Sequence, residues 1–176
     1  KTRELIDNTD CPVLTTYKAK GVISDHHPQY AGIFTGGMAE SACISKADLI
    51  IMIGVDPVEF VLQKWRYQIP IIDISVVEYP VHYVKPDVGL YGPINNSISA
   101  LLNGISVLSS DWKVPDIKAL RDDMHHALQC HAEEGIGAQD VVEVALESAM
   151  SKHTLNQEKK LPLITVDAGA HMFSVM

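Results

Sequence analysis

The sequence predicts an α/β domain built on a doubly wound, mostly parallel sheet. Two apolar runs, residues 48–55 and 70–75, stand between segments of helical character. A strand that is apolar throughout is typical of the middle of a parallel sheet, where helices cover both faces. Short buried strands that alternate with helices favour this class over other α and β arrangements.

Composition narrows the functional classes. The chain has 176 residues, of which 47% are apolar and 20% charged, as in an ordinary globular domain. Its 14 basic and 22 acidic residues give a net charge of −8, which argues against binding to nucleic acid. No apolar run approaches the roughly 20 residues that span a bilayer, so we expect no membrane association. Cys11, Cys43 and Cys130 are too scattered for a disulfide framework, which favours reduced thiols and a cytoplasmic location.

The first half of the chain is expected to hold the sheet. β-Branched residues at 12–16 favour a strand, and the glycines and proline within 18–37 indicate a long connection. A further strand is expected over 84–91, closed by Gly92 and Pro93. The helices expected in this half cover residues 1–9, 38–46, 60–67 and 94–102.

The second half is expected to be mainly helical. Residues 105–115 read as a linker between a partial central domain (1–104) and a second region (116–176). In the predicted helix 115–131, apolar residues recur at spacings of three and four positions. A second helix is expected over 138–150. The last apolar run, 161–167, predicts a strand. The apolar positions of the first of these helices are Ile117, Leu120, Met124 and Leu128.

Two glycine-containing turns are candidate ligand sites. The strand that ends near Asp167 runs into the small residues Ala168, Gly169 and Ala170, followed by His171. Such a turn at the carboxyl end of a strand exposes backbone N–H groups that can hold a diphosphate. An ordinary strand-to-helix turn is the alternative. Gly36-Gly37 forms a similar but weaker candidate, because it lacks the spacing of a dinucleotide fingerprint or a P-loop.

Other polar clusters favour structural roles. His126 and Cys130 are four residues apart on the predicted helix, and this spacing permits metal ligation. Because the apolar face of the same helix is formed by other residues, we expect these two side chains to lie on the solvent-facing side. Asp25, His26 and His27 precede Pro28 in a loop, where positioning is the simpler role. The carboxylates of Asp56 and Glu59 flank Pro57 and favour helix capping over acid/base work. Since no catalytic template is present, we name no catalytic and no metal-binding residue.

Several ordered segments together resemble the thiamine-diphosphate-dependent enzymes of the acetolactate synthase group. The resemblance implies that the chain is a fragment of a longer polypeptide, which its start at Lys1 and its uncapped apolar end at Met176 also suggest. It covers nearly the whole chain and rests on Pro12 to Ile23, Asp25, His27-Pro28, Ala31-Gly32, Ala47 to Asp56, Ile72 to Ile74 with Glu78, and Thr165 to Phe173.

The resemblance implies a function and a cofactor site. The parent enzyme would use thiamine diphosphate and Mg²⁺ to decarboxylate a small 2-oxo acid and pass the product carbanion to an acceptor. Ala168, Gly169, Ala170 and His171 would contact the diphosphate. The family's activating glutamate and its Gly-Asp-Gly…Asn-Asn magnesium motif lie outside these residues, so the fragment alone would be a scaffold and subunit interface without activity. A homo-oligomer, dimer or tetramer, is implied.

The resemblance also bears on FAD and on the completeness of the sheet. Family members that hold FAD use a glycine turn after the domain's first strand and an arginine after the third strand. The first strand is absent here and Asp56 stands where the arginine would be, which argues against a flavin. Residues 163–166 are a speculative occupant of the vacant strand position. Five positions nevertheless match those of the FAD-binding members: Thr16, Tyr17, Gly32, Gly54 and Val55. The alternative function is a stand-alone nucleotide- or FAD-binding regulatory domain without catalysis.

Overall fold

The computed structural model describes residues 1–59, 64–80, 84–105, 110–128, 135–155 and 165. The chain divides into two compact units, residues 1–124 and 125–176. The first unit holds every strand that the structure describes. Within the described ranges, no helix is long and apolar enough to span a membrane.

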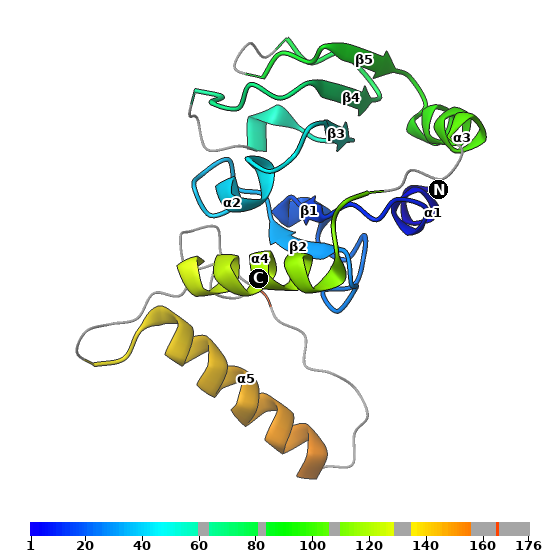
Figure 1. The fold of residues 1–176 in the computed structure, drawn as a ribbon. Coiled ribbons are helices and arrows are strands. Elements are labelled where there is room, and N and C mark those ends of the chain that lie inside the picture. The colour runs from blue at the N-terminus through cyan, green and yellow to red at the C-terminus, as the bar shows by residue number, and fades with distance from the viewer. Residues whose placement is uncertain (60–63, 81–83, 106–109, 129–134, 156–164, 166–176) are drawn as a thin grey trace. The chain divides into compact units, whose positions relative to one another are not determined.

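The strands form two parallel sheets (Figure 1). In the first, β1 (Val13–Thr15) pairs with β2 (Tyr30–Ile33). In the second, β3 (Ile50–Ile53), β4 (Ile71–Ser75) and β5 (Val88–Tyr91) lie in that order. Parallel pairing throughout, with helices between the strands, confirms the predicted α/β class.

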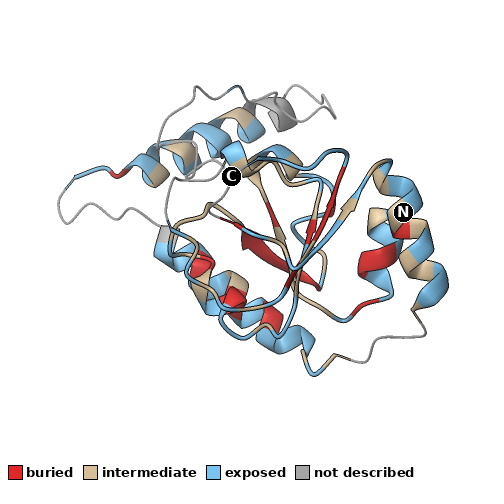
Figure 2. Ribbon diagram, turned by 90° about the horizontal axis from the view of Figure 1, so that it is seen from above, coloured by how far each residue is buried: buried red, intermediate tan, exposed pale blue. Residues whose placement is uncertain are grey.

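The middle strand β4 is the most buried part of the second sheet. Ile71 and Ile74 are 2% and 0% exposed, and the polar residues Asp73 and Ser75 on the same strand are also buried. Figure 2 shows buried residues, drawn in red, along strands of the fold. A strand buried on both faces cannot hydrate its polar groups, so these two side chains bond to each other: the Ser75 hydroxyl donates to Asp73 Oδ1 at 2.6 Å. Apolar side chains therefore make up most of β4, as the sequence pattern predicted.

Different elements cover the two faces of the second sheet. On one face, α3 (Ile94–Gly104) contacts β4, and its Ile98 is fully buried. On the other face, Met52 and Ile71 form a core cluster with Val84, against which partly buried side chains pack. The side chains packed against this cluster are Phe34, Ile50, Val55 and Trp65. The sheet thus has the two covered faces that a parallel sheet requires.

The first sheet is covered by the start of α4 (Val114–Leu128). Ile117 and Leu120 join Ala31 and Cys43 in one buried cluster. This confirms the predicted apolar face of the helix for the three positions that the structure describes, Ile117, Leu120 and Met124. The remaining elements are α1 (Thr2–Asp7), the 3₁₀ turns η1 (Tyr17–Ala19) and η2 (Pro57–Glu59), α2 (Ser41–Ile44), and, in the second unit, α5 (Ala138–Leu155).

Three predicted elements were wrong in type or extent. The supposed connection 18–37 contains strand β2, whose four residues are all buried and whose pairing with β1 depends on a tertiary contact that a short sequence window does not contain. The helix predicted over 38–46 is one turn, α2. Residues 64–67, predicted as helix, are irregular, because Trp65 packs against Phe34 and Tyr67 instead. The rest of that predicted helix (60–63) and all of the predicted strand 161–167 except Thr165 lie outside the described residues.

Gly32 supplies the first prediction. Its φ is +128°, and a Cβ there would lie 2.3 Å from Met124 Sδ. Gly32→Ala should therefore lower the free energy of unfolding by about 2–4 kcal/mol through backbone strain and overpacking. Urea denaturation measures this difference.

The matched control is Gly104→Ala at the end of α3, where an added Cβ meets nothing within 4 Å. It should change the free energy of unfolding by no more than about 0.5 kcal/mol. Equal effects of the two substitutions would show that Gly32 is not held against α4 as the structure has it.

Candidate functional site

The carboxyl ends of parallel strands are where ligands bind in open α/β sheets. In the first sheet this edge consists of the turn after β2, residues 34–37, and the start of η1 after β1. In the second sheet it consists of residues 54–56 after β3, and of the residues that follow β4 and β5. These positions include the sequence-predicted turn Gly36-Gly37 and the carboxylate of Asp56.

The turn after β2 is closed by its own side chains. The Phe34 N–H donates to the carbonyl oxygen of Thr15 at 2.8 Å, which ties the turn to β1. The Thr35 hydroxyl donates to Glu40 Oε2 at 3.0 Å and accepts the backbone N–H of Gly37 at 3.0 Å. Because Gly37 already donates within the turn and a carboxylate lies beside it, this turn is unsuited to hold a phosphate.

Glu40 is the most unusual residue of this edge. Its side chain is fully buried, and Oε1 has no hydrogen-bond partner among the described residues. The hydroxyls of Thr15 and Tyr67 and the indole Nε1 of Trp65 are likewise buried without a described partner. Buried polar atoms normally find partners, so a group of them near one strand end marks a place able to receive a polar ligand group.

Ring contacts bring the 65–67 segment to this edge. The Phe34 and Trp65 ring centroids are 6.3 Å apart, and those of Trp65 and Tyr67 are 5.1 Å apart in an edge-to-face arrangement. Arg66, between the two aromatic residues, donates to the sulfur of Met38. We define Thr15, Thr35, Glu40, Trp65 and Tyr67 as the polar cluster of the first sheet.

Electrostatics links Tyr67 to Glu40. Burial raises the pKa of the Tyr67 phenol above its ordinary value of 10.0, the nearby Glu40 carboxylate raises it further, and Arg66 lowers it. The phenol therefore stays a neutral donor at neutral pH. Together with the indole N–H and the carboxylate, it suits the polar cluster to a neutral hydrogen-bonding or cationic group and not to an anion.

The carboxyl edge of the second sheet is acidic. Asp56 Oδ1 accepts the backbone N–H of Val58 at 3.0 Å, so Asp56 caps η2 as predicted. Burial raises the pKa of the Tyr91 phenol, and the nearby carboxylates of Asp73 and Glu78 raise it further. Carboxylates therefore lie at or next to the carboxyl ends of β3 and β4.

The histidines occupy positioning or solvent-exposed sites. His27 Nδ1 accepts the backbone N–H of Gln29 at 3.2 Å, and its Nε2 lies 3.3 Å from Asp7 Oδ1, so the ring anchors the loop before β2. His125 and His126 are exposed on α4, while Cys130 lies outside the described residues. Across the described ranges no three potential ligands come together in a metal site.

The residues predicted to hold a diphosphate, Ala168, Gly169, Ala170 and His171, lie outside the described residues, and their role stays a prediction. Sequence reasoning missed Glu40, Trp65 and Tyr67. The available signal was Glu40 itself, an acidic residue between Ala39 and Ser41 and three positions after Gly37, because a carboxylate is unusual in a segment that becomes buried.

Parallel strand pairs, helices on the sheet faces and polar groups gathered at the carboxyl edge define a doubly wound α/β protein of the Rossmann-like class. The particular family follows from comparison with known proteins. Residues 1–101 match the family described as "Thiamine pyrophosphate enzyme, central domain", and the chain belongs to this family.

The names of individual relatives give two activities, pyruvate decarboxylase and acetolactate synthase. The chain is 32% identical to pyruvate decarboxylase isozyme 3 of Saccharomyces cerevisiae over 88 residues, covering 48% of this chain and 15% of the relative. It is 25% identical to acetolactate synthase of Bacillus subtilis over 179 aligned residues, covering 96% of this chain and 30% of the relative. The chain therefore spans less than a third of the length of either protein.

The polar cluster yields a titration prediction. Glu40→Gln removes the negative charge that opposes ionisation of Tyr67, so the pKa of Tyr67 should fall toward 10.0 while the effect of burial remains. Ultraviolet absorbance titration, with Tyr67→Phe to assign the transition, measures the change.

Glu78→Gln is the control. It should lower the pKa of Tyr91 and leave that of Tyr67 unchanged, because Glu78 acts on Tyr91 alone of these two phenols. A Tyr67 titration that is indifferent to Glu40→Gln would contradict the proximity of the two side chains.

Proposed function

We propose that this chain is the middle part of a longer thiamine-diphosphate-dependent enzyme that decarboxylates a small 2-oxo acid and can join the product to an acceptor. The observation that carries the proposal is the family match over residues 1–101. The similarity to acetolactate synthase, which extends over nearly the whole chain and so beyond the central domain, supports it further. Relatives named as a pyruvate decarboxylase and as an acetolactate synthase support both reactions.

Within that enzyme the chain serves as scaffold and subunit interface. We assign residues 1–104 to the central domain, 105–115 to a linker, and 116–176 to a helical connection and the beginning of the cofactor-binding domain. The polypeptide is a homo-oligomer, dimer or tetramer, of the cytoplasm, and this part alone is inactive because the family's activating glutamate and magnesium motif are not among residues 1–176. A net charge of −8 agrees with a partner that is a small molecule and not a nucleic acid.

Ala168, Gly169, Ala170 and His171 are the residues proposed to contact the cofactor's diphosphate. Backbone N–H groups in a turn of small residues can approach phosphate oxygens closely, and the His171 ring can donate a further hydrogen bond. When bound, thiamine diphosphate supplies a nucleophilic carbon and an electron sink for the carbanion left by decarboxylation. Mg²⁺ belongs to the same proposal, its ligands lying outside residues 1–176.

The alternative function is a stand-alone nucleotide- or FAD-binding regulatory domain. Its ligand would have to bring a diphosphate to the carboxyl ends of the strands. There the buried Glu40 and the carboxylates of Asp56 and Asp73 oppose an anion. The family match over residues 1–101 supports the enzyme over the regulatory domain.

The cofactor residues can be tested directly. In the longest product of this coding region, His171→Ala and Gly169→Val should each weaken thiamine diphosphate binding at least about tenfold in the presence of Mg²⁺, since they remove a donor and fill the turn. Isothermal titration calorimetry measures the dissociation constant.

His125→Ala, which changes an exposed histidine of α4, is the matched control and should leave the affinity unchanged. Tight binding that both turn variants preserve would refute the assignment of residues 168–171. Failure of the unmodified protein to bind thiamine diphosphate would refute the proposed function itself.

A further inference from the structure

The polar cluster of the first sheet contains side-chain atoms that its own residues do not satisfy. Four of these atoms are buried without a described hydrogen-bond partner: Thr15 Oγ1, Glu40 Oε1, Trp65 Nε1 and Tyr67 Oη. Each has lost its contact with water without gaining a hydrogen bond, which is costly. Four such atoms at one strand end indicate a place that an additional polar group completes.

Glu40 determines what that group must donate. Its side chain is fully buried, and Oε2 accepts the hydroxyl of Thr35 at 3.0 Å. The other oxygen, Oε1, has no partner among the described residues. A carboxylate oxygen can only accept a hydrogen bond, so the missing partner must carry an N–H or O–H group.

Trp65 and Tyr67 make the opposite demand. The indole Nε1 of Trp65 can only donate, so it needs an acceptor. The Trp65 ring is held beside this edge by Phe34 and Tyr67, at centroid distances of 6.3 Å and 5.1 Å. The Tyr67 phenol is a neutral donor, because burial and the nearby Glu40 both raise its pKa. Two donors that lack an acceptor thus accompany a carboxylate that lacks a donor.

These demands argue against an ionic ligand group. A carboxylate or a phosphate offers no hydrogen to Glu40 and is repelled by its charge. An ammonium or a guanidinium offers no acceptor to Trp65. The guanidinium of Arg66 is also close enough to lower the pKa of Tyr67, and it would repel a second cation.

A primary carboxamide matches all four atoms. Its NH₂ group supplies two donors, and its carbonyl oxygen has two lone pairs. The two donors suit Glu40 Oε1 and the hydroxyl oxygen of Thr15. The carbonyl oxygen suits the N–H of Trp65 and the O–H of Tyr67.

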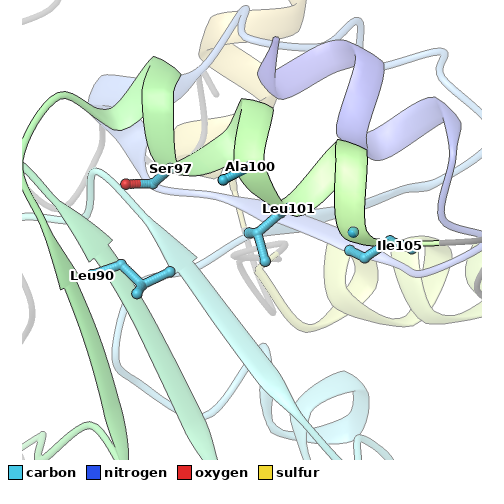
Figure 3. A pocket seen from close by; sticks show the side chains of 6 residues that line it. Leu90, Ser97, Ala100, Leu101 and Ile105 are labelled. Carbon is cyan, nitrogen blue, oxygen red and sulfur yellow. The ribbon is translucent and has the colours of Figure 1, made fainter.

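The groove between β5 and α3 provides a contrast within the same unit (Figure 3). Its volume is about 480 Å³, and its lining side chains are apolar apart from one hydroxyl. The side chains labelled there are Leu90, Ser97, Ala100, Leu101 and Ile105. None of them contributes a buried polar atom without a partner. A polar ligand group is therefore expected at the polar cluster and not in this groove.

The segment that covers the cluster is suited to admit a ligand. Residues 64–67 are irregular, and the exposed Lys64 and Arg66 alternate with the partly buried Trp65 and Tyr67. Movement of this segment separates ring contacts but unpairs no strand and unwinds no helix. Such segments open at the lowest cost in a folded protein.

We propose that the polar cluster is a binding site for a small molecule that carries a neutral primary carboxamide. The amide NH₂ group donates to Glu40 and Thr15, and the amide carbonyl accepts from Trp65 and Tyr67. The site lies within residues 15–67 and uses none of residues 168–171, so it does not depend on the proposed function.

Three probes test the class of ligand: benzamide, benzoate and benzylamine present a neutral amide, an anion and a cation on the same ring. Each is titrated into the ¹⁵N-labelled longest product of the coding region. NMR follows the indole N–H resonance of Trp65, which is identified by its loss in Trp65→Phe. Benzamide should shift this resonance saturably, with a dissociation constant at least about tenfold lower than those of the other two probes. The indole resonance of Trp112, which packs against a different cluster, should not shift.

Two substitutions test the contacts. Glu40→Gln replaces a charged acceptor by a neutral one, and Tyr67→Phe removes a donor, so each should weaken benzamide binding at least about fivefold. Tyr91→Phe removes a phenol of the second sheet and is the matched control. It should leave the dissociation constant of benzamide unchanged.

Three outcomes would overturn the proposal. The first is no saturable shift of the Trp65 resonance with any probe, which would leave the cluster to a buried water molecule. The second is binding of benzoate or benzylamine as tight as that of benzamide, which would assign the cluster to an ion. The third is benzamide binding that Tyr67→Phe leaves unchanged, and this variant decides the matter even if Glu40→Gln does not fold.

Discussion

Parallel strand pairing is the constraint on which the rest of this structure depends. Parallel neighbours cannot be joined by tight turns, so each pair needs a crossover, and each face of the sheet needs a cover. In β4, Ile71 and Ile74 are buried. The strand is covered by α3 on one face and by the cluster around Met52 on the other. The same pairing aligns the carboxyl ends of the strands and so creates the edge where the polar cluster lies.

The two sheets are linked through few residues. Phe34 bonds to β1 through its backbone and packs into the second sheet through its ring, and the following Thr35 and Glu40 close the turn. Burying the Glu40 carboxylate beside Tyr67 and Trp65 has an energetic cost that hydrogen bonds from Thr35 offset only at one oxygen. This edge therefore links the two sheets and also contains buried polar atoms that have no described hydrogen-bond partner. Its negative charge disfavours the anionic ligands that many related folds hold.

The sequence was most informative where a pattern is local. The apolar runs that became β3 and β4 and the helical repeat of Ile117, Leu120 and Met124 were predictable from periodicity. β2 was not, because four residues that include Gly32 become a strand only by pairing with β1. Nor was the polar cluster predictable, since Glu40 and Tyr67 are far apart in sequence and meet through the packing of Trp65 on Phe34.

The family match and the two sheets occupy the same part of the chain. Residues 1–101, which match the central domain of thiamine pyrophosphate enzymes, include all the strands of both sheets. The chain covers 30% of the Bacillus subtilis acetolactate synthase to which it is similar, so most of that relative has no counterpart in these residues.

Sequencing the coding region on both sides of these 176 residues is the most direct test of the proposed enzyme. We expect upstream a domain that carries the activating glutamate, and beyond Met176 a Gly-Asp-Gly…Asn-Asn motif for Mg²⁺. A stop codon directly after Met176, together with no upstream domain, would contradict the enzyme and leave the chain as a binding module.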